Sequence, residues 1–330
     1  MSIPELELGV ERLKESGFEV TIDPQCRKKH LYFAGEDEVR ARALFEAAHD
    51  PQSELVWCAR GGYGAGRLLP ILERLTQERG VPPCKVLAGY SDTTALYAFV
   101  RARWGWSVLH SPMPGFRGFC VIPEPNWRAL VDAVSGAFSA ASYPWNRKKL
   151  KFFKGTAPEA AIEADLVGGN LSVYNSVSST PFAEEPRGKM VFFEDVDEPL
   201  YKMDRYVTQL ELSGALRGAQ GIILGHHEGV FDRVGQGLKK LPSARTRDRV
   251  IRSPKPSELE PLRKPVEVAR GLEFIFGGLG RRLGIPVAYG LPVGHGPAGQ
   301  CPLPLHARYR LSPQGQFELL HWDGWTEARE

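Results

Sequence analysis

The first third of the chain alternates short apolar runs with helical patterns, and this alternation restricts the possible folds more than any other feature. The apolar runs lie at 55–58 (LVWC), 85–90 (KVLAGY) and 107–110 (SVLH). Between them, residues 67–80 and 92–105 carry apolar side chains at the spacing of an amphipathic helix. Short strands that alternate with such helices predict an α/β fold, a parallel sheet covered by helices. Two further helical patterns, at 5–16 and 36–49, precede the first strand and complete the first predicted domain.

The rest of the chain predicts a second domain. Residues 121–163 are rich in Pro, Trp and Lys, and we expect a linker there, which gives domains at 1–145 and 163–330 joined by 146–162. The second domain is expected to contain strands at 164–169, 190–196, 221–227, 286–290, 302–311 and 316–322, helices from residue 170, at 201–216 and at 266–283, and a long polar excursion at 231–265.

Composition narrows the class of protein. The 330 residues are 42% hydrophobic and 25% charged, and the net charge of +3 is spread over mixed Lys, Arg, Asp and Glu, so no nucleic-acid surface is predicted. Five cysteines, an odd number without a C-x-x-C pair, indicate reduced thiols. No signal peptide and no apolar run of about 20 residues is visible, so we expect a cytoplasmic protein that does not bind a membrane.

The tetrapeptide GYSD at 89–92 lies between a predicted strand and a predicted helix. A serine at such a turn is presented at the carboxyl edge of the sheet, beside the free N–H groups of the helix, which suits a nucleophile. The match to the Gly-x-Ser-x-Gly elbow is incomplete, because Thr93 replaces the second glycine. Since serine is also a favoured helix N-cap, the turn alone leaves both interpretations of Ser91 open.

A serine nucleophile needs a base, and the base needs an orienting partner. His295 lies in the loop GLPVGHGPAG directly after a predicted strand, and Glu194 ends the apolar run MVFF, where α/β proteins collect ligands. Each also has a plainer interpretation, His295 as a loop residue bonded to a carbonyl and Glu194 as a helix cap. His226 and His227 lie next to Glu228, but no H-E-x-x-H motif is present, so we expect no metal and no organic cofactor.

Closely spaced glycines follow the strand at 55–58, in ARGGYGAGR at 59–67. The spacing matches neither the P-loop nor G-x-G-x-x-G, so a phosphate site is not favoured. Backbone N–H groups of such a loop can serve an oxyanion instead. We expect the N–H groups of Gly62 and Asp92 to be the oxyanion donors, and Arg60 and Tyr63 to contact substrate.

Seven segments together resemble the LD-carboxypeptidase family of serine peptidases, which includes the microcin C immunity peptidases. They are HLYFAGEDEVRARAL, LVWCARGGYGAGRLLPIL, GYSDTTAL, LHSPMP, LVGGNLS, FFEDVDEPLYKMDR and IPVAYGLPVGHGP, and they occur in the family's order. The resemblance implies that Ser91 is the nucleophile and that Glu194 and His295 complete a catalytic triad. It also implies a flavodoxin-like N-terminal domain, a swivelling β/β/α C-terminal domain and an active site between them.

The resemblance further implies a function. The expected reaction removes the terminal D-Ala from murein tetrapeptides through an acyl-enzyme, as in cell-wall peptide recycling, and the expected assembly is a homodimer. Three departures leave alternatives: the family's opening strand of the type IGVVAPS is not visible, the excursion at 231–265 is unusually long, and residues 170–182 are unusually polar. A peptidase acting on peptidyl or aminoacyl nucleotides, or a non-enzymatic two-lobed small-molecule binding protein, therefore stays open.

Overall fold

The computed structural model describes residues 3–137, 143, 149–230, 265–296 and 300–324. The excursion predicted at 231–265 lies outside the described residues except for residue 265. Among the described helices, none is long and apolar enough to cross a membrane. The cytoplasmic location stays a prediction.

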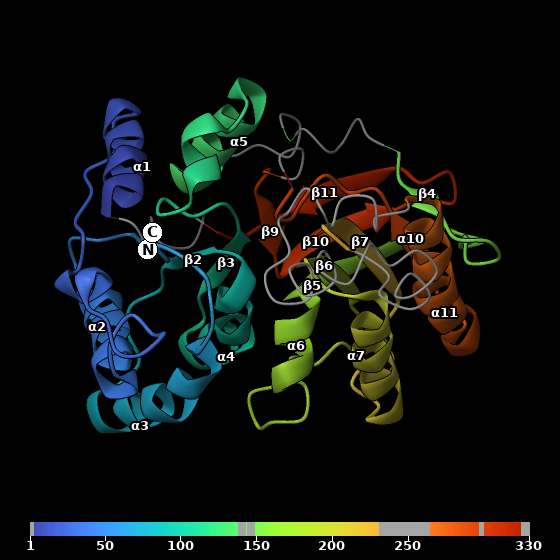
Figure 1. Ribbon diagram of the computed structural model, residues 1–330, viewed down its shortest axis with the longest axis horizontal. Coiled ribbons are helices and arrows are strands. Elements are labelled where there is room, and N and C mark those ends of the chain that lie inside the picture. Colours follow the sequence, from blue (N-terminus) through green and yellow to red (C-terminus); the bar gives the residue numbers. More distant parts are fainter. Residues whose placement is uncertain (1–2, 138–142, 144–148, 231–264, 297–299, 325–330) are drawn as a thin grey trace, which may run out of the picture.

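The first sheet contains four strands in the order β1-β2-β3-β9 (Figure 1). The strands are β1 (Leu55–Trp57), β2 (Val86–Gly89), β3 (Ser107–His110) and β9 (Leu303–Leu305). β1, β2 and β3 pair in parallel, and every residue of β2 and β3 is buried, as expected for strands covered on both faces. The helices of this half are α1 (Ile3–Glu15), α2 (Asp37–His49), α3 (Leu69–Arg79), α4 (Thr94–Trp104) and α5 (Glu124–Val134).

The second sheet contains seven strands in the order β11-β10-β5-β6-β7-β8-β4. They are β4 (Lys151–Phe152), β5 (Ile162–Asn170), β6 (Met190–Val196), β7 (Gly221–Glu228), β8 (Val287–Tyr289), β10 (Ala307–Leu311) and β11 (Phe317–His321). β5 to β8 pair in parallel, and the outer strands are antiparallel. Its helices are α6 (Leu171–Val177), α7 (Leu200–Leu212), α10 (Pro265–Leu272) and α11 (Gly278–Leu283), with a π-helical turn at Glu273–Gly277.

These elements confirm the predicted α/β class and its two sheets. They also show two features that the sequence did not indicate. β9, from the C-terminal part of the chain, pairs with β3 in the first sheet, and β4, inside the predicted linker, pairs with β8 in the second. The domain boundaries 1–145, 146–162 and 163–330 stay a proposal. Because β9 pairs in the first sheet and β4 in the second, no single point of the sequence separates the strands of the two sheets.

Strand β6 separates the two main groups of buried apolar side chains. Met190 and Phe192 join a cluster that includes β1, β2, β3 and β9, whereas Val191 and Phe193 join a second cluster beneath α7 and α11. This split follows the two-residue period of a strand. One face of the second sheet is therefore packed against the first half of the molecule. The end of β6, where Glu194 lies, is next to that contact.

We predict that Gly168→Ala strongly destabilises the protein. Gly168 in β5 has φ +117°, and a Cβ there would lie 2.1 Å from the carbonyl oxygen of Phe192. Gly188, at φ +75° with open space around it, is the matched control. Gly188→Ala should lower the free energy of unfolding by about 1–2 kcal/mol through backbone strain alone. Gly168→Ala should cost more than about 3 kcal/mol in urea unfolding, and equal losses for both variants would contradict the packing described for β5 and β6.

Candidate active site

Ser91 lies at a strained turn between β2 and α4. Its φ is +60°, in the left-handed region that residues other than glycine seldom adopt, which is typical of functional positions. A short 3-10 turn at Ser91–Thr93 precedes α4, and the N-cap of α4 is Thr93 without a side-chain capping bond. Ser91 therefore does not cap α4, and its partly exposed side chain is left available for chemistry.

The glycine loop at 59–67 packs against the turn that contains Ser91. A Cβ at Gly61 would lie 2.9 Å from Ser91 Oγ, so only glycine allows the loop to approach this closely. On the other side, Asp92 Oδ2 accepts a hydrogen bond of 2.8 Å from the N–H of Ala65. Burial raises the pKa of Asp92. The sequence singled out Gly62 in this loop, but Gly61 is the glycine that touches Ser91.

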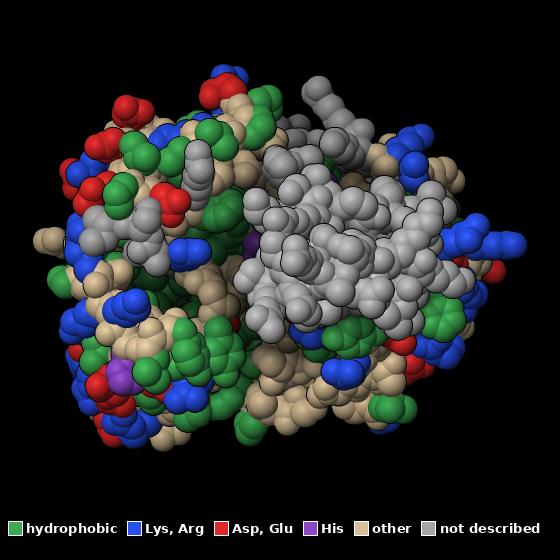
Figure 2. Space-filling model, viewed as in Figure 1, with side chains coloured by type: hydrophobic (Ala, Val, Ile, Leu, Met, Phe, Trp, Pro, Cys, Tyr) green, Lys and Arg blue, Asp and Glu red, His purple; other side chains and the backbone are tan. Residues whose placement is uncertain are grey.

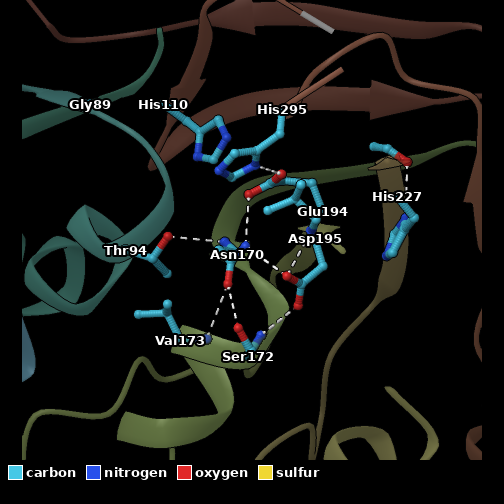
Figure 3. Close-up of polar contacts among 12 residues, drawn as sticks. Gly89, Thr94, His110, Asn170, Ser172, Val173, Glu194, Asp195, His227 and His295 are labelled. Carbon is cyan, nitrogen blue, oxygen red and sulfur yellow. Dashed lines mark hydrogen bonds and ion pairs between the residues drawn. The ribbon is translucent and has the colours of Figure 1, made fainter. Parts of the chain in front are cut away.

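Glu194 and His295 form a buried pair (Figure 3). Glu194 lies near the end of β6 with no exposed surface, and its Oε2 is 2.7 Å from Nδ1 of His295, in the loop that follows β8. An ionised carboxylate can only accept hydrogen bonds, so Nδ1 carries the proton. In the neutral imidazole, Nε2 is then free to act as a base.

The pair determines the protonation of both groups. Burial by itself lowers the pKa of His295, but the charge of Glu194 and the hydrogen bond to it outweigh burial, so this pKa lies above 6.5. Burial by itself raises the pKa of Glu194, yet His295 reverses the direction and the pKa is lowered. Burial, followed by the charge of Glu194, raises the pKa of the neighbouring Asp195 to about 7.

Asn170 links the two acidic residues Glu194 and Asp195 to α4, the helix that follows Ser91. Its Nδ2 donates to Glu194 Oε1 at 3.2 Å and to Asp195 Oδ1 at 3.1 Å. Its backbone N–H donates to Thr94 Oγ1, in the first turn of α4, at 3.0 Å (Figure 3). The sequence pattern predicts a helix that starts at Asn170 but no role for this residue in the site. An amide directly after a buried strand, at the carboxyl edge of the sheet, was the available signal.

One aromatic ring packs against His295, and a second histidine is buried nearby (Figure 3). The ring of Tyr90, directly before Ser91, lies 4.5 Å from that of His295, measured between centroids. The Tyr97 hydroxyl donates to the carbonyl of Gly89 at 2.8 Å and can therefore accept from Nδ1 of His110 at 3.2 Å. Burial lowers the pKa of His110 to about 4, so this second histidine stays neutral.

The structure does not bring every predicted residue into direct contact. Among the described residues, no hydrogen bond joins Ser91 Oγ to His295, so the last contact of the triad stays a prediction. Arg60 is exposed but near enough for its charge to affect Tyr90, and Tyr63 is exposed on the glycine loop. In the part of the chain that the structure describes, no group of three or more His, Cys, Asp or Glu side chains is arranged to hold a metal ion.

Two family models match the two halves of the chain. Residues 1–111 match the LD-carboxypeptidase N-terminal domain, and residues 163–274 match the LD-carboxypeptidase C-terminal domain. The chain belongs to the LD-carboxypeptidase family. This confirms the family predicted from the seven segments and agrees with the predicted enzyme class, a serine-type carboxypeptidase.

Several similar proteins are named as carboxypeptidases of murein peptides. A probable murein peptide carboxypeptidase of Bacillus subtilis is 31% identical, over 66% of each chain, so that match spans about two thirds of the relative's length. A murein tetrapeptide carboxypeptidase of Pseudomonas aeruginosa is 28% identical over 96% of this chain and 88% of the relative. The crystal structure of a muramoyltetrapeptide carboxypeptidase from Oxalobacter formigenes is 25% identical, covers 97% of this chain and 95% of its own, and has a TM-score of 0.67.

We predict that His295 titrates above pH 6.5 and that Glu194→Gln moves its pKa downward. The glutamine keeps the size of the side chain but removes the charge that favours the imidazolium, so burial alone then acts on the histidine. NMR titration of ¹⁵N-histidine-labelled protein measures this, with His295→Gln used to assign the signal. An unchanged or higher pKa in Glu194→Gln would contradict the pairing.

Proposed function

We propose that this chain is a serine carboxypeptidase that removes the terminal D-Ala from murein tetrapeptides through an acyl-enzyme. The observation that carries the proposal is the buried hydrogen bond between Glu194 Oε2 and His295 Nδ1, which leaves Nε2 as the ring nitrogen that can act as the base when the imidazole is neutral. Ser91, in its left-handed turn against Gly61, is the nucleophile of the proposed triad. The names of the murein peptidases among the relatives support the choice of substrate.

The proposed reaction has two halves. Ser91 Oγ attacks the carbonyl carbon of the last peptide bond while His295 Nε2 takes the hydroxyl proton, and Glu194 stabilises the resulting imidazolium. The C–N bond then breaks, and the histidine returns that proton to the nitrogen of the departing D-Ala. In the second half, water attacks the ester carbonyl and loses a proton to His295. The C–O bond to Ser91 then breaks, and the histidine gives that proton to Oγ, which restores the serine hydroxyl and releases the shortened peptide.

The remaining parts of the proposal concern charge. The tetrahedral intermediate carries an oxyanion, and we assign its stabilisation to the N–H groups of Asp92 and Gly62. Gly61 supports this assignment, because its contact with Ser91 brings the glycine loop next to the nucleophile. The free carboxylate of the substrate needs a cation, and our candidate is Arg60, an exposed residue whose charge reaches Tyr90.

A second candidate function is cleavage of a peptidyl or aminoacyl nucleotide. It is favoured by one relative, the Microcin C7 self-immunity protein MccF of Escherichia coli, which is 26% identical over 69% of this chain and 71% of its own. The two functions share the triad and differ in the group attached to the acyl carbon.

The third possibility, a two-lobed binding protein without activity, has no support from the relatives, which are named as carboxypeptidases. The homodimer stays a prediction.

Mass spectrometry of the purified protein incubated with disaccharide-tetrapeptide tests the proposal. Loss of a single alanine is the expected result. An aminoacyl sulfamoyl adenosine assayed in parallel distinguishes the second candidate. Cleavage of that compound alone, with the tetrapeptide intact, would overturn the proposed substrate while leaving the triad in place.

We predict that Ser91→Ala abolishes release of D-Ala while the protein stays folded. Loss of the nucleophile should reduce kcat by at least about 10³-fold, because the members of a triad act as a unit. The unfolding midpoint should stay within a few degrees of the parent, since Ser91 caps no helix. Ser135→Ala, an exposed serine at the end of α5, is the matched control and should keep full activity. Near-normal turnover by folded Ser91→Ala would refute the assignment.

A further inference from the structure

Residues 30–33 form a tight hairpin that displays two large apolar side chains to solvent. His30 and Phe33 exchange both backbone hydrogen bonds, at 3.0 and 2.8 Å. Between them, Leu31 adopts φ +52°, which is strained for a branched residue, and is 72% exposed, while Tyr32 is 76% exposed. Exposed apolar side chains held in a strained turn indicate a surface with a function.

Tyr32 belongs to a group of three aromatic rings, which we call the aromatic platform: Tyr32, Phe33 and Tyr63. The centroids of Tyr32 and Phe33 are 4.3 Å apart, and that of Tyr63 is 5.8 Å from Phe33 and 6.2 Å from Tyr32. Tyr63 is 64% exposed, so two of the three rings face solvent. In Figure 2, hydrophobic side chains gather beside Lys and Arg on the half of the molecule that contains α2, α3 and α4.

Contacts with two arginines and with the glycine loop hold Phe33, the least exposed ring of the platform, in place. The guanidinium groups of Arg40 and Arg67 lie 5.0 and 5.4 Å from the ring centre of Phe33. Asp37 forms ion pairs of 2.6 Å with both arginines. A Cβ at Gly64 would lie 2.7 Å from the Phe33 ring, so the glycine loop also packs against it. Phe33 is therefore fixed, and the two tyrosines are presented on a prearranged surface.

The platform lies close to the proposed nucleophile. Tyr63 is two residues from Gly61, which touches Ser91, so at most about 7 Å of backbone separates the two loop positions. A tyrosine side chain extends further still. In a tetrapeptide, the three residues on the acyl side of the last bond span roughly 10 Å when extended. The group attached to the far end of the peptide can therefore reach the platform.

We propose that the aromatic platform binds the sugar end of a glycan-linked peptide, an inference that rests on the proposed function and names the substrate class of the same site. The apolar faces of pyranose rings pack on aromatic rings, and the tyrosine hydroxyls can bond sugar hydroxyls. The three rings are tilted by 30–43° to one another. They therefore form no parallel slot of the kind that would sandwich a flat nucleobase, whereas a puckered sugar can lie across tilted faces.

Calorimetric titration of the inactive Ser91→Ala protein tests this without turnover. The probes are a tetrapeptide, the same peptide carrying N-acetylglucosaminyl-N-acetylmuramic acid, and adenosine monophosphate. The disaccharide should tighten binding about tenfold, and Tyr32→Ala should reduce this advantage to about twofold or less. Tyr32→Phe, which keeps the ring, should retain most of it. Tyr201→Ala, which removes a tyrosine that is 42% exposed on α7, is the control and should leave the advantage unchanged.

Three results would overturn the inference. The first is an equal affinity for the peptide with and without the disaccharide, and the second is a disaccharide advantage that survives Tyr32→Ala. The third is Tyr32-dependent binding of adenosine monophosphate that is tighter than binding of the disaccharide peptide, which would make the platform a nucleobase site. Disaccharide binding that depends on Tyr32, in a protein whose parent releases no D-Ala, would count against the proposed function and support the platform.

Discussion

The buried carboxylate of Glu194 is the constraint on which the site depends. A charged group without exposed surface is costly unless it is paired and hydrogen-bonded. Glu194 meets this requirement with His295 on one oxygen and Asn170 on the other. The loop after β8 and the start of α6 are therefore fixed by the same carboxylate, and so is the tautomer of the histidine.

The two sheets meet through a shared apolar core and through a close approach of β5 to the start of α4. Apolar side chains of β1, β2, β3 and β9 pack with those of β5, β6, β10 and β11 in one cluster. At the edge of that cluster, a Cβ at Gly169 would lie 2.5 Å from Thr94 Oγ1, and the next residue, Asn170, donates to the same oxygen. The helix that follows Ser91 is thus attached to the strand that leads to Asn170. This attachment brings a nucleophile from one sheet towards an acid and a base from the other.

Local sequence patterns predicted the elements well, because a strand such as Val86–Gly89 or a helix such as Thr94–Trp104 is encoded by its own residues. The pairing of β9 with β3 was not predictable in this way, since it depends on where distant segments meet. The site shows the same division. Ser91, Glu194 and His295 each had a plainer interpretation alone, and their assignment came from the resemblance of seven segments in order. The contact of Gly61 with Ser91, the bridge made by Asn170 and the tilted contact between the rings of Tyr90 and His295 arise only from tertiary packing.

The most direct test of the central claim is detection of the covalent intermediate on Ser91. Protein mixed with disaccharide-tetrapeptide is quenched with acid at times within one turnover, and the intact mass and the peptide that carries any adduct are determined. We predict an adduct on Ser91 whose mass equals that of the substrate without its terminal alanine. An adduct on another residue, or release of alanine with Ser91 unmodified at every quench time, would contradict it.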